Sequence, residues 1–262
     1  TMENNPLMQQ LGSNSIAALH FDSSGQLWVN IDDRIAICTT EFVNIRSHTL
    51  LPGHFLVNRF CEDARHRVWA ATQSGLVRWE GIRAQNVLFR DCDVQDVIQL
   101  NDSTMLAAVS GQGVCAVDIR YSETRPYVQT ADSLVANALR RSTCLYGAKD
   151  GSLWIGTRSH GLLRYHPQQG FRSYTLRDGF ASNEIAAITQ DPQGNTWVTT
   201  SYGLSFITAS TERVTTYFQT DRLQSQQFYP HCSLNTSSMI YFGGNTGLVQ
   251  FAPGRVIPKI TK

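Results

Sequence analysis

The sequence carries little net charge, no long apolar run and no leader-like segment. Lysine and arginine number 22 against 21 for aspartate and glutamate, so the formal net charge is +1 and nucleic-acid binding is not expected. No apolar run approaches the length needed to cross a bilayer. Residues Thr1 to Gln10 lack the basic region and apolar core of a signal peptide. Because the chain begins with threonine rather than methionine, we expect a fragment of a longer protein.

Motifs for catalysis and for metal binding are also absent. The sequence has no Gly-x-Ser-x-Gly, no His-Glu-x-x-His and no glycine-rich phosphate loop. Its six cysteines form no Cys-x-x-Cys pair, and its seven histidines show no helical metal spacing. Most cysteines stand inside apolar runs, which favours buried, reduced thiols, although export would allow disulfides. We therefore expect no catalytic residue, no metal, no cofactor and no enzymatic activity in this chain.

What the sequence does contain is a repeat. In residues 151–165 (GSLWIGTRSHGLLRY) a short apolar run ends in a polar turn, and a glycine then opens a second apolar run. This order predicts a β-hairpin, with glycine supplying backbone freedom at the turn. Residues 67–79 and 194–206 repeat it. The anchor residues of the repeats stand 37 to 48 positions apart: Trp28, Trp69, Leu106, Trp154, Trp197 and Tyr241.

This period predicts an all-β fold, a β-propeller of about six four-stranded blades. One alternating run before each hairpin and one after it complete the four strands, and neighbouring blades bury each other's faces. A β-sandwich with evenly spaced strands is the alternative, but sandwich strands share no internal motif. We treat residues 1–262 as a single domain, with blades at about 11–49, 50–90, 91–130, 131–177, 178–220 and 221–262.

Closure of the ring stays open at the last blade. After Phe251 the chain contains Pro253 and Pro258, which discourage a fourth strand. A strand from residues 4–10 would complete the blade, although Asn and Pro there are poor strand formers. Either the six blades close on themselves in this way, or the native ring is larger and has blades outside this chain.

The clearest repeats resemble the two-component regulator propeller repeat. The resemblance is carried by residues 178–185 (DGFASNEI), 191–197 (DPQGNTW) and 151–157 (GSLWIGT), with Gly203-Leu204 after the turn. Residues 241–248 (YFGGNTGL) are similar to the final repeat of that family. The resemblance covers nearly the whole chain and is weakest in the third blade.

The resemblance implies a sensor region. In that family such repeats form the periplasmic part of bacterial membrane-bound receptors, whose output is a histidine kinase, a hybrid kinase or a diguanylate cyclase. The ligands are often oligosaccharides. It therefore implies a non-enzymatic, ligand-sensing propeller of an inner-membrane receptor, reaching the membrane only through missing parts of the parent protein. We expect a small-molecule or oligosaccharide ligand, a homodimer and a periplasmic location.

Two other functions stay open. The propeller face of a pure interaction scaffold would bind protein or dimerise. An enzyme is the third hypothesis, because some small propellers resemble lyases of cyclic peptides. The missing acid–base constellation counts against that enzyme.

Candidate ligand contacts lie at the hairpin tips, whose side chains are not needed for packing. Charged, amide and aromatic groups from several tips are expected on one face of the disc, where they suit a sugar; a solvated turn is the alternative. We interpret the recurring Asn14, Asn58, Asn137 and Asn183 as groups that satisfy turn backbone rather than ligand contacts. The candidate ligand-binding residues are Asp32, Arg34, Gln73, Arg158, His160 and Tyr202.

Overall fold

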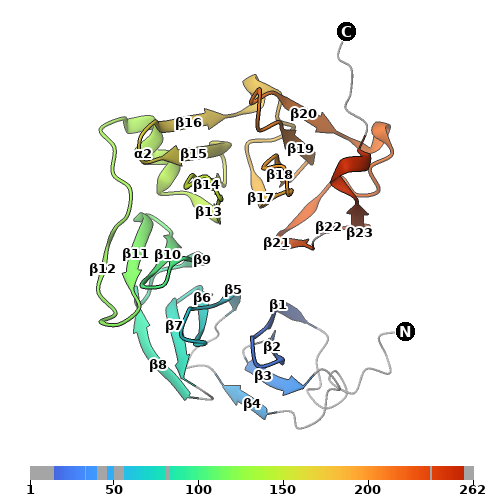
Figure 1. The fold of residues 1–262 in the computed structure, drawn as a ribbon. Helices are drawn as coiled ribbons and strands as arrows, with labels where there is room; N and C mark the ends of the chain where they lie inside the picture. The colour runs from blue at the N-terminus through green and yellow to red at the C-terminus, as the bar shows by residue number, and fades with distance from the viewer. Residues whose placement is uncertain are drawn as a thin grey trace. The chain divides into compact units, whose positions relative to one another are not determined.

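A computed structural model of the chain describes residues 15–32, 34–39, 46–49, 56–80, 83–236 and 238–256. Its strands form six antiparallel sheets, five of four strands and one of three (Figure 1). The β-propeller of six blades expected from the repeat is therefore confirmed. The chain divides into two compact units, Thr1–Val128 and Gln129–Lys262.

The first unit holds three blades, in which the strands pair in chain order. The first strands of these blades, β1, β5 and β9, lie side by side. The first blade contains β1 (Ile16–Phe21), β2 (Gln26–Ile31), β3 (Arg34–Thr39) and β4 (Arg46–Thr49). The second contains β5 (Val57–Glu62), β6 (Val68–Thr72), β7 (Gly75–Glu80) and β8 (Arg83–Leu88). The third contains β9 (Val94–Asn101), β10 (Thr104–Val109), β11 (Gly113–Asp118) and β12 (Thr124–Pro126).

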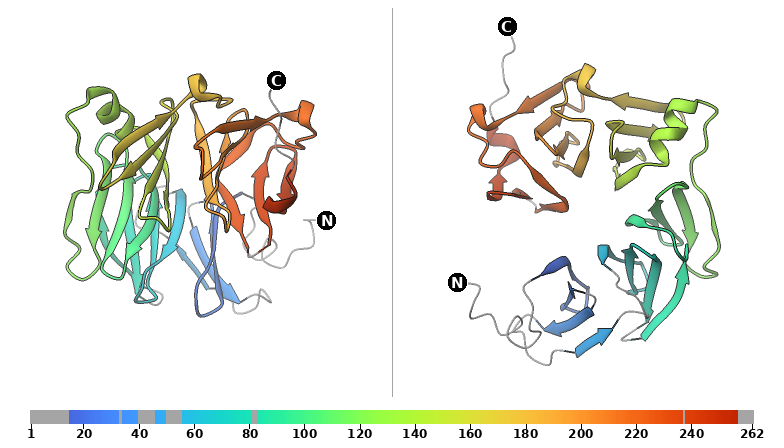
Figure 2. Two further views of the ribbon diagram at one scale, coloured as in Figure 1. Left: turned by 45° about the horizontal axis from the view of Figure 1, so that its top comes forward. Right: turned by 180° about the vertical axis from the view of Figure 1, so that it is seen from behind.

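The second unit holds the other three blades, again with the first strands, β13, β17 and β21, side by side (Figure 2). The fourth blade contains β13 (Ser142–Gly147), β14 (Leu153–Thr157), β15 (Leu162–His166) and β16 (Gly170–Tyr174). The fifth contains β17 (Ile185–Gln190), β18 (Thr196–Thr200), β19 (Gly203–Ile207) and β20 (Val214–Tyr217). The sixth contains β21 (Phe228–Asn235), β22 (Ile240–Gly244) and β23 (Gly247–Phe251). Short helices join them: α2 (Ser133–Leu139), η2 (Leu176–Asp178), η3 (Gln219–Asp221) and, after β23, η4 (Pro253–Arg255).

The anchor residues fill the space between blades. The ring of Trp28 lies 6.0 Å from that of Trp79 in the next blade, edge to face, and both are buried. Leu106 is fully buried in the third blade, so an aliphatic anchor serves there as well. In the sixth blade Tyr241 is only half-buried, and the flanking Ile240 and Phe242 are fully buried instead. Each blade thus buries large side chains of the neighbouring blade, and this burial stabilises both.

A threonine closes the tip between the second and third strands in three blades. In the fourth blade the Thr157 hydroxyl donates to the carbonyl of Gly161 at 2.7 Å and accepts from the backbone N–H of His160 at 2.9 Å. Thr72 and Thr200 make the same bond to the glycine carbonyl. These hydroxyls are buried, so the paired backbone offsets their desolvation.

The main chain also ties every tip to the start of its own blade. The backbone N–H of one tip residue donates to the carbonyl just before the first strand, at 2.9 to 3.3 Å in all six blades. These tips therefore share one position relative to their own sheet. The six donor–acceptor pairs are Asp32–Ser15, Gln73–Leu56, Ser110–Asp93, Arg158–Arg141, Ser201–Glu184 and Asn245–Gln227.

An aspartate holds the anchor tryptophan at the opposite end of three blades. The indole Nε1 of Trp28 donates to Asp22 at 2.7 Å, that of Trp69 to Asp63 at 2.7 Å and that of Trp197 to Asp191 at 3.1 Å. In each pair the acid stands six residues before the tryptophan, in the turn between the first and second strands. A buried indole N–H needs such an acceptor.

Burial raises the pKa of Asp22 and of Asp63, but the hydrogen bonds that each carboxylate accepts outweigh burial. For Asp22 these bonds come from Ser24, Trp28 and Gln26, and for Asp63 from Arg67, Trp69 and Arg65. The pKa of both groups is therefore below the ordinary aspartate value. The two aspartates are charged acceptors at neutral pH.

The recurring asparagines and the last blade can be compared with the sequence-based expectations. Residues 133–139 form a helix, with the Asp132 carboxylate accepting from the N–H of Leu134 at 2.8 Å, so Asn137 is helical and not at the start of a strand. Asn58 donates to the carbonyl of Val94, the first residue of β9, and Asn183 accepts from the N–H of Leu176, the first residue of η2. Within the described residues the sixth blade has three strands. Asp33, Asn14, the closing strand at 4–10 and Pro258 lie outside the described residues.

Candidate functional site

A groove of about 560 Å³ opens in the second unit, at the loops that follow the first strands. This volume lies in the range of sites that enclose small ligands. The fourth blade contributes its turn after β13, and the fifth blade its turns after β17 and after β19. The sixth blade contributes the turn after β21. The lining residues are Tyr146, Lys149, Asp150, Gln190, Asp191, Pro192, Gln193, Gly194, Ala209, Asn235 and Thr236.

The candidate residues from the sequence lie at the other ends of the strands. Arg158 and His160 occupy the tip between β14 and β15, and Tyr202 the tip between β18 and β19. In the first unit Asp32 and Arg34 share the tip between β2 and β3. Gln73 lies in the tip between β6 and β7. None of the six lines the groove, and their role in ligand binding stays a prediction.

Contacts at these tips are mostly local. The amide Nδ2 of Asn30 donates to the carbonyl of Asp32 at 3.3 Å and to that of Arg34 at 3.0 Å, which joins the two residues in one turn. The hydroxyl of Ser159 lies 3.1 Å from Nδ1 of His160. The half-exposed ring of Tyr202 packs 5.9 Å from that of Phe218. The first two contacts lie within one turn each, and the third joins the tip to the segment after β20.

The groove has the chemistry of a site for a polar ligand without large net charge. Lys149 contributes one cation, and Asp150 and Asp191 contribute two carboxylates. Asp150 accepts from Arg164, and Asp191 accepts from Asn195 and Trp197. Gln190, Gln193 and Asn235 contribute amides. The Asn235 amide donates to the carbonyl of Gln190, which links the turn of the sixth blade to the fifth.

Tyr146 adds an aromatic ring to the wall of the groove. Burial raises the pKa of its phenol, against hydrogen bonds with Gln190 and Thr189 that lower it. An aromatic face beside amides and hydroxyls is what sugars and other neutral polyols require for stacking and hydrogen bonding.

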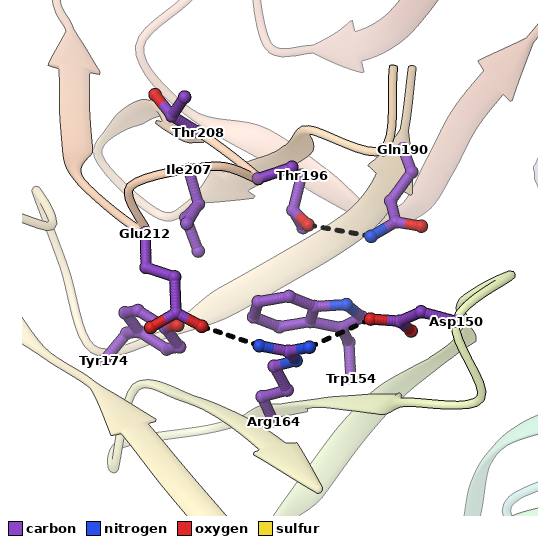
Figure 3. A pocket seen from close by; sticks show the side chains of 11 residues that line it. Asp150, Trp154, Arg164, Tyr174, Gln190, Thr196, Ile207, Thr208 and Glu212 are labelled. Carbon is purple, nitrogen blue, oxygen red and sulfur yellow. Dashed lines mark hydrogen bonds and ion pairs between the residues drawn. The ribbon is translucent and has the colours of Figure 1, made fainter. Parts of the chain in front are cut away.

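An inner chamber of about 50 Å³ lies between the fourth and fifth blades and shares part of its wall with the groove (Figure 3). Asp150, Gln190, Gly194 and Ala209 line both spaces. The chamber is large enough for a water molecule or a small polar group. Its other lining residues are Trp154, Arg164, Tyr174, Thr196, Ile207, Thr208 and Glu212.

Arg164 is the central cation of the chamber. Its guanidinium donates to Asp150 Oδ2 at 2.9 Å and to Glu212 Oε1 at 2.7 Å, and Figure 3 shows the two carboxylates on either side of it. It also donates to Ser152 Oγ at 3.0 Å and lies 5.6 Å from the Trp154 ring. Burial raises the pKa of Asp150, but bonds from Ser152 and Arg164 outweigh it, so the pKa lies below its usual value.

Two polar atoms of the chamber wall lack a protein partner of normal geometry within the described residues. These atoms are the indole Nε1 of Trp154 and the hydroxyl of Tyr174. The two side chains are only 4% and 1% exposed. Burial raises the pKa of Tyr174, against the nearby charges of Arg172 and Arg164 and a hydrogen bond with Arg164, which lower it. Arg164 can only donate to the Tyr174 oxygen, so the hydroxyl hydrogen still lacks an acceptor. An unpaired buried donor costs about 1–3 kcal/mol, so both groups need an acceptor.

The missing acceptor follows from one sequence difference. Ala148 occupies the turn position that aspartate holds in three other blades. Its N–H donates to the carbonyl four residues on, at 2.8 Å, as those of Asp22, Asp63 and Asp191 do at 2.9 to 3.0 Å. An alanine has no carboxylate to receive the indole N–H of Trp154. Sequence reasoning missed this site, although the departure from the repeat is visible in the letters.

Two further results concern metals and membranes. Among the residues that the structure describes, no three His, Cys, Asp or Glu side chains gather as a metal site would require. None of the described helices has the length and hydropathy of a membrane-spanning segment.

Comparisons with known proteins find one family model and one kinase that are similar to part of the chain. The family model described as "Two component regulator propeller" matches residues 179–202. "Histidine kinase P4" of Formosa agariphila is 29% identical over 101 residues, which are 38% of this chain and 7% of that protein.

Two solved structures share the fold. The extracellular domain of a putative hybrid two-component system from B. thetaiotaomicron superimposes with a TM-score of 0.77 at 20% identity, over 92% of this chain and 34% of that one. A virginiamycin B lyase from Staphylococcus aureus gives a TM-score of 0.72 at 11% identity, over 90% of this chain and 79% of that one.

The structural matches at these identities show the fold alone. The chain spans 7% of the kinase and about a third of the hybrid-system domain. The family match falls on residues 179–202, within the repeat whose residues carry the resemblance. The chain thus contains a match to the two-component regulator propeller model at residues 179–202, and it shares its six-bladed fold with extracellular domains of two-component systems.

Proposed function

We propose that this chain is a non-enzymatic, ligand-sensing propeller in the periplasmic region of a two-component-type receptor. The family match and the likeness to extracellular sensor domains support this proposal. The ligand is a neutral oligosaccharide or a similar small polar molecule. Binding biases the output of a kinase or cyclase elsewhere in the parent protein, through a homodimer.

The observation that carries the proposal is the polar groove of the second unit. Three consecutive blades contribute to its wall. One ligand in the groove therefore contacts all three blades and alters the stability of each blade relative to the other two. Tyr146, Gln193 and Asn235 present an aromatic ring and two amides in one space of about 560 Å³. A polyol satisfies such groups without bringing a charge that the wall does not compensate.

A thermal-shift screen of the whole chain with neutral and acidic oligosaccharides tests this function. At a ligand concentration one hundred times Kd, binding adds about 2.7 kcal/mol of stability. For a chain of this size that free energy raises the melting temperature by about 5–10 °C. A cooperative melt that no saccharide moves would refute an oligosaccharide ligand.

Matched variants locate the site. Lys149→Ala and Gln193→Ala change exposed groove residues, and we expect each to weaken saccharide binding about five- to twentyfold. Arg158→Ala and Tyr202→Ala change the tips and serve as controls that should bind normally. The reverse pattern would move the ligand to the tips, as the sequence predicts. Mass measurements at several concentrations test the homodimer.

A further inference from the structure

The fourth blade is an exception within its own repeat. In three blades the anchor indole donates to an aspartate six residues earlier, whereas Ala148 occupies that position before Trp154. The turn backbone is the same in all four, so only the acceptor is missing. The indole N–H of Trp154 is buried, and the Trp154 side chain lines the inner chamber.

The second unpartnered donor belongs to the same wall. The Tyr174 hydroxyl is buried, and the ring of Tyr174 lies 5.7 Å from that of Trp154. Two side chains that line one space thus each carry a buried hydrogen-bond donor without a protein acceptor among the described residues. Such a pair costs stability in an empty protein and favours any oxygen that reaches both.

The charges around the chamber already balance. Arg164 pairs with Asp150 and Glu212, and Arg172 pairs with the other oxygen of Glu212. Two cations therefore meet two carboxylates. An entering anion would find no uncompensated cation in this set and would lie close to Asp150 and Glu212, so its desolvation would not be offset.

We propose that the inner chamber is a subsite for one uncharged oxygen acceptor, an amide carbonyl or a hydroxyl, at the end of a ligand that lies in the groove. Its connection to a larger ligand rests on the proposed function of the groove; its preference for a neutral acceptor rests on Trp154 and Tyr174 alone. The chamber volume of about 50 Å³ admits a terminal group of a few atoms and excludes a sugar ring.

The test uses the five tryptophans of the chain as reporters. The indole N–H groups give separate proton–nitrogen resonances in a labelled sample of the whole chain, and Trp154→Phe identifies the resonance of Trp154. Acetamide and acetate are the probes, because they have the same size and differ in charge. We expect acetamide at millimolar concentrations to move the Trp154 resonance in a saturable way, and acetate to leave it in place.

Two variants test the acceptor argument. Tyr174→Phe removes one hydroxyl without changing the ring, and we expect acetamide affinity to fall about five- to tenfold. A hydroxyl that serves packing alone would leave the affinity unchanged. Ala148→Asp restores the acid of the other blades; it should hydrogen-bond Trp154, raise the melting temperature and abolish the acetamide response.

The outcomes separate this proposal from the proposed function. It is overturned if acetamide and acetate move the Trp154 resonance alike, if neither moves it, or if folded Ala148→Asp responds as the wild type does. Should Ala148→Asp not fold, Tyr174→Phe and the two probes decide. An acetamide response at Trp154 without saccharide binding in the groove would keep the subsite and reject the oligosaccharide function. Saccharide binding that is unchanged in Tyr174→Phe, with no acetamide response, would reject the subsite and keep the oligosaccharide function.

Discussion

Asp63 is the acid on which the second blade depends, and its replacement by alanine gives the sharpest test of the repeat. The carboxylate is 3% exposed. It accepts from the backbone N–H groups of Arg65 at 2.9 Å and Arg67 at 3.1 Å, and from Trp69 Nε1 at 2.7 Å. It also pairs with the Arg67 guanidinium at 2.7 Å. Asp63→Ala removes all of these acceptors together.

The cost follows from the groups left behind. The indole N–H of Trp69, whose side chain is 1% exposed, becomes a buried donor without its acceptor and costs about 1–3 kcal/mol. Breaking a buried ion pair costs about 3–5 kcal/mol when one partner remains. Arg67 keeps its bond to the carbonyl of Ile119 at 2.7 Å, which offsets part of that loss. We therefore expect Asp63→Ala to lower the free energy of unfolding by about 3–5 kcal/mol.

Urea unfolding of the full chain measures this loss, and the melting temperature should fall by about 6–20 °C. Asp63→Asn keeps one amide oxygen for Trp69 and should lose about half as much. Asp102→Ala, in the exposed turn between β9 and β10, is the matched control and should change stability by less than about 0.5 kcal/mol. A loss below about 1 kcal/mol for Asp63→Ala would show that the aspartate–tryptophan bond does not hold the blade.

Two further predictions concern glycine and pH. Gly161 has φ +78°, and a Cβ there would lie 2.2 Å from the Tyr174 carbonyl oxygen, so Gly161→Ala should lower the free energy of unfolding by about 3 kcal/mol or more. The control Gly25→Ala should lower it by about 1 kcal/mol, because φ is +80° there but the space is open. Equal losses in urea unfolding would contradict the clash. The pKa values of Asp22, Asp63 and Asp150 are lowered in the folded chain, so their stabilisation is complete above the ordinary aspartate pKa of about 4 and is lost as pH falls through the folded values. Melting temperatures between pH 7 and pH 2 should therefore decline at the acid end, with a smaller decline in Asp63→Asn; an equal decline would exclude Asp63 as a source.

Much of the fold follows from the sequence because the repeat encodes it several times. The Trp-x-x-Thr order of β6, β14 and β18 places a buried ring and a turn-closing hydroxyl on the same strand, and glycine follows at the tip. A third blade with Leu106 as its anchor still forms four strands, because neighbouring blades bury that position whatever apolar residue it holds. By contrast, the described residues of the other blades contain no counterpart of α2, so the repeat gives no sign of it.

The candidate ligand residues at the tips stay a prediction. The tips attract attention because their side chains vary, whereas the groove and the chamber lie at the opposite ends of the strands. Ala148 marks the chamber as a break in the aspartate pattern, which the sequence alone displays. The residues that form the chamber wall could not be predicted in this way. Arg164 and Glu212 are 48 positions apart in the chain, and only the packing of two blades brings them together. Composition and spacing contain no such pairing.

The backbone bond between each tip and the start of its blade has a consequence for how such chains evolve. Because this joint uses only main-chain atoms, a duplicated blade needs no matched pair of side chains to rebuild it. A new copy of the blade can therefore form this bond as soon as it arises, and later side-chain substitutions at its tip do not remove the bond. Gene duplication can lengthen the array one module at a time, while selection for new ligands acts on surfaces that the architecture does not use.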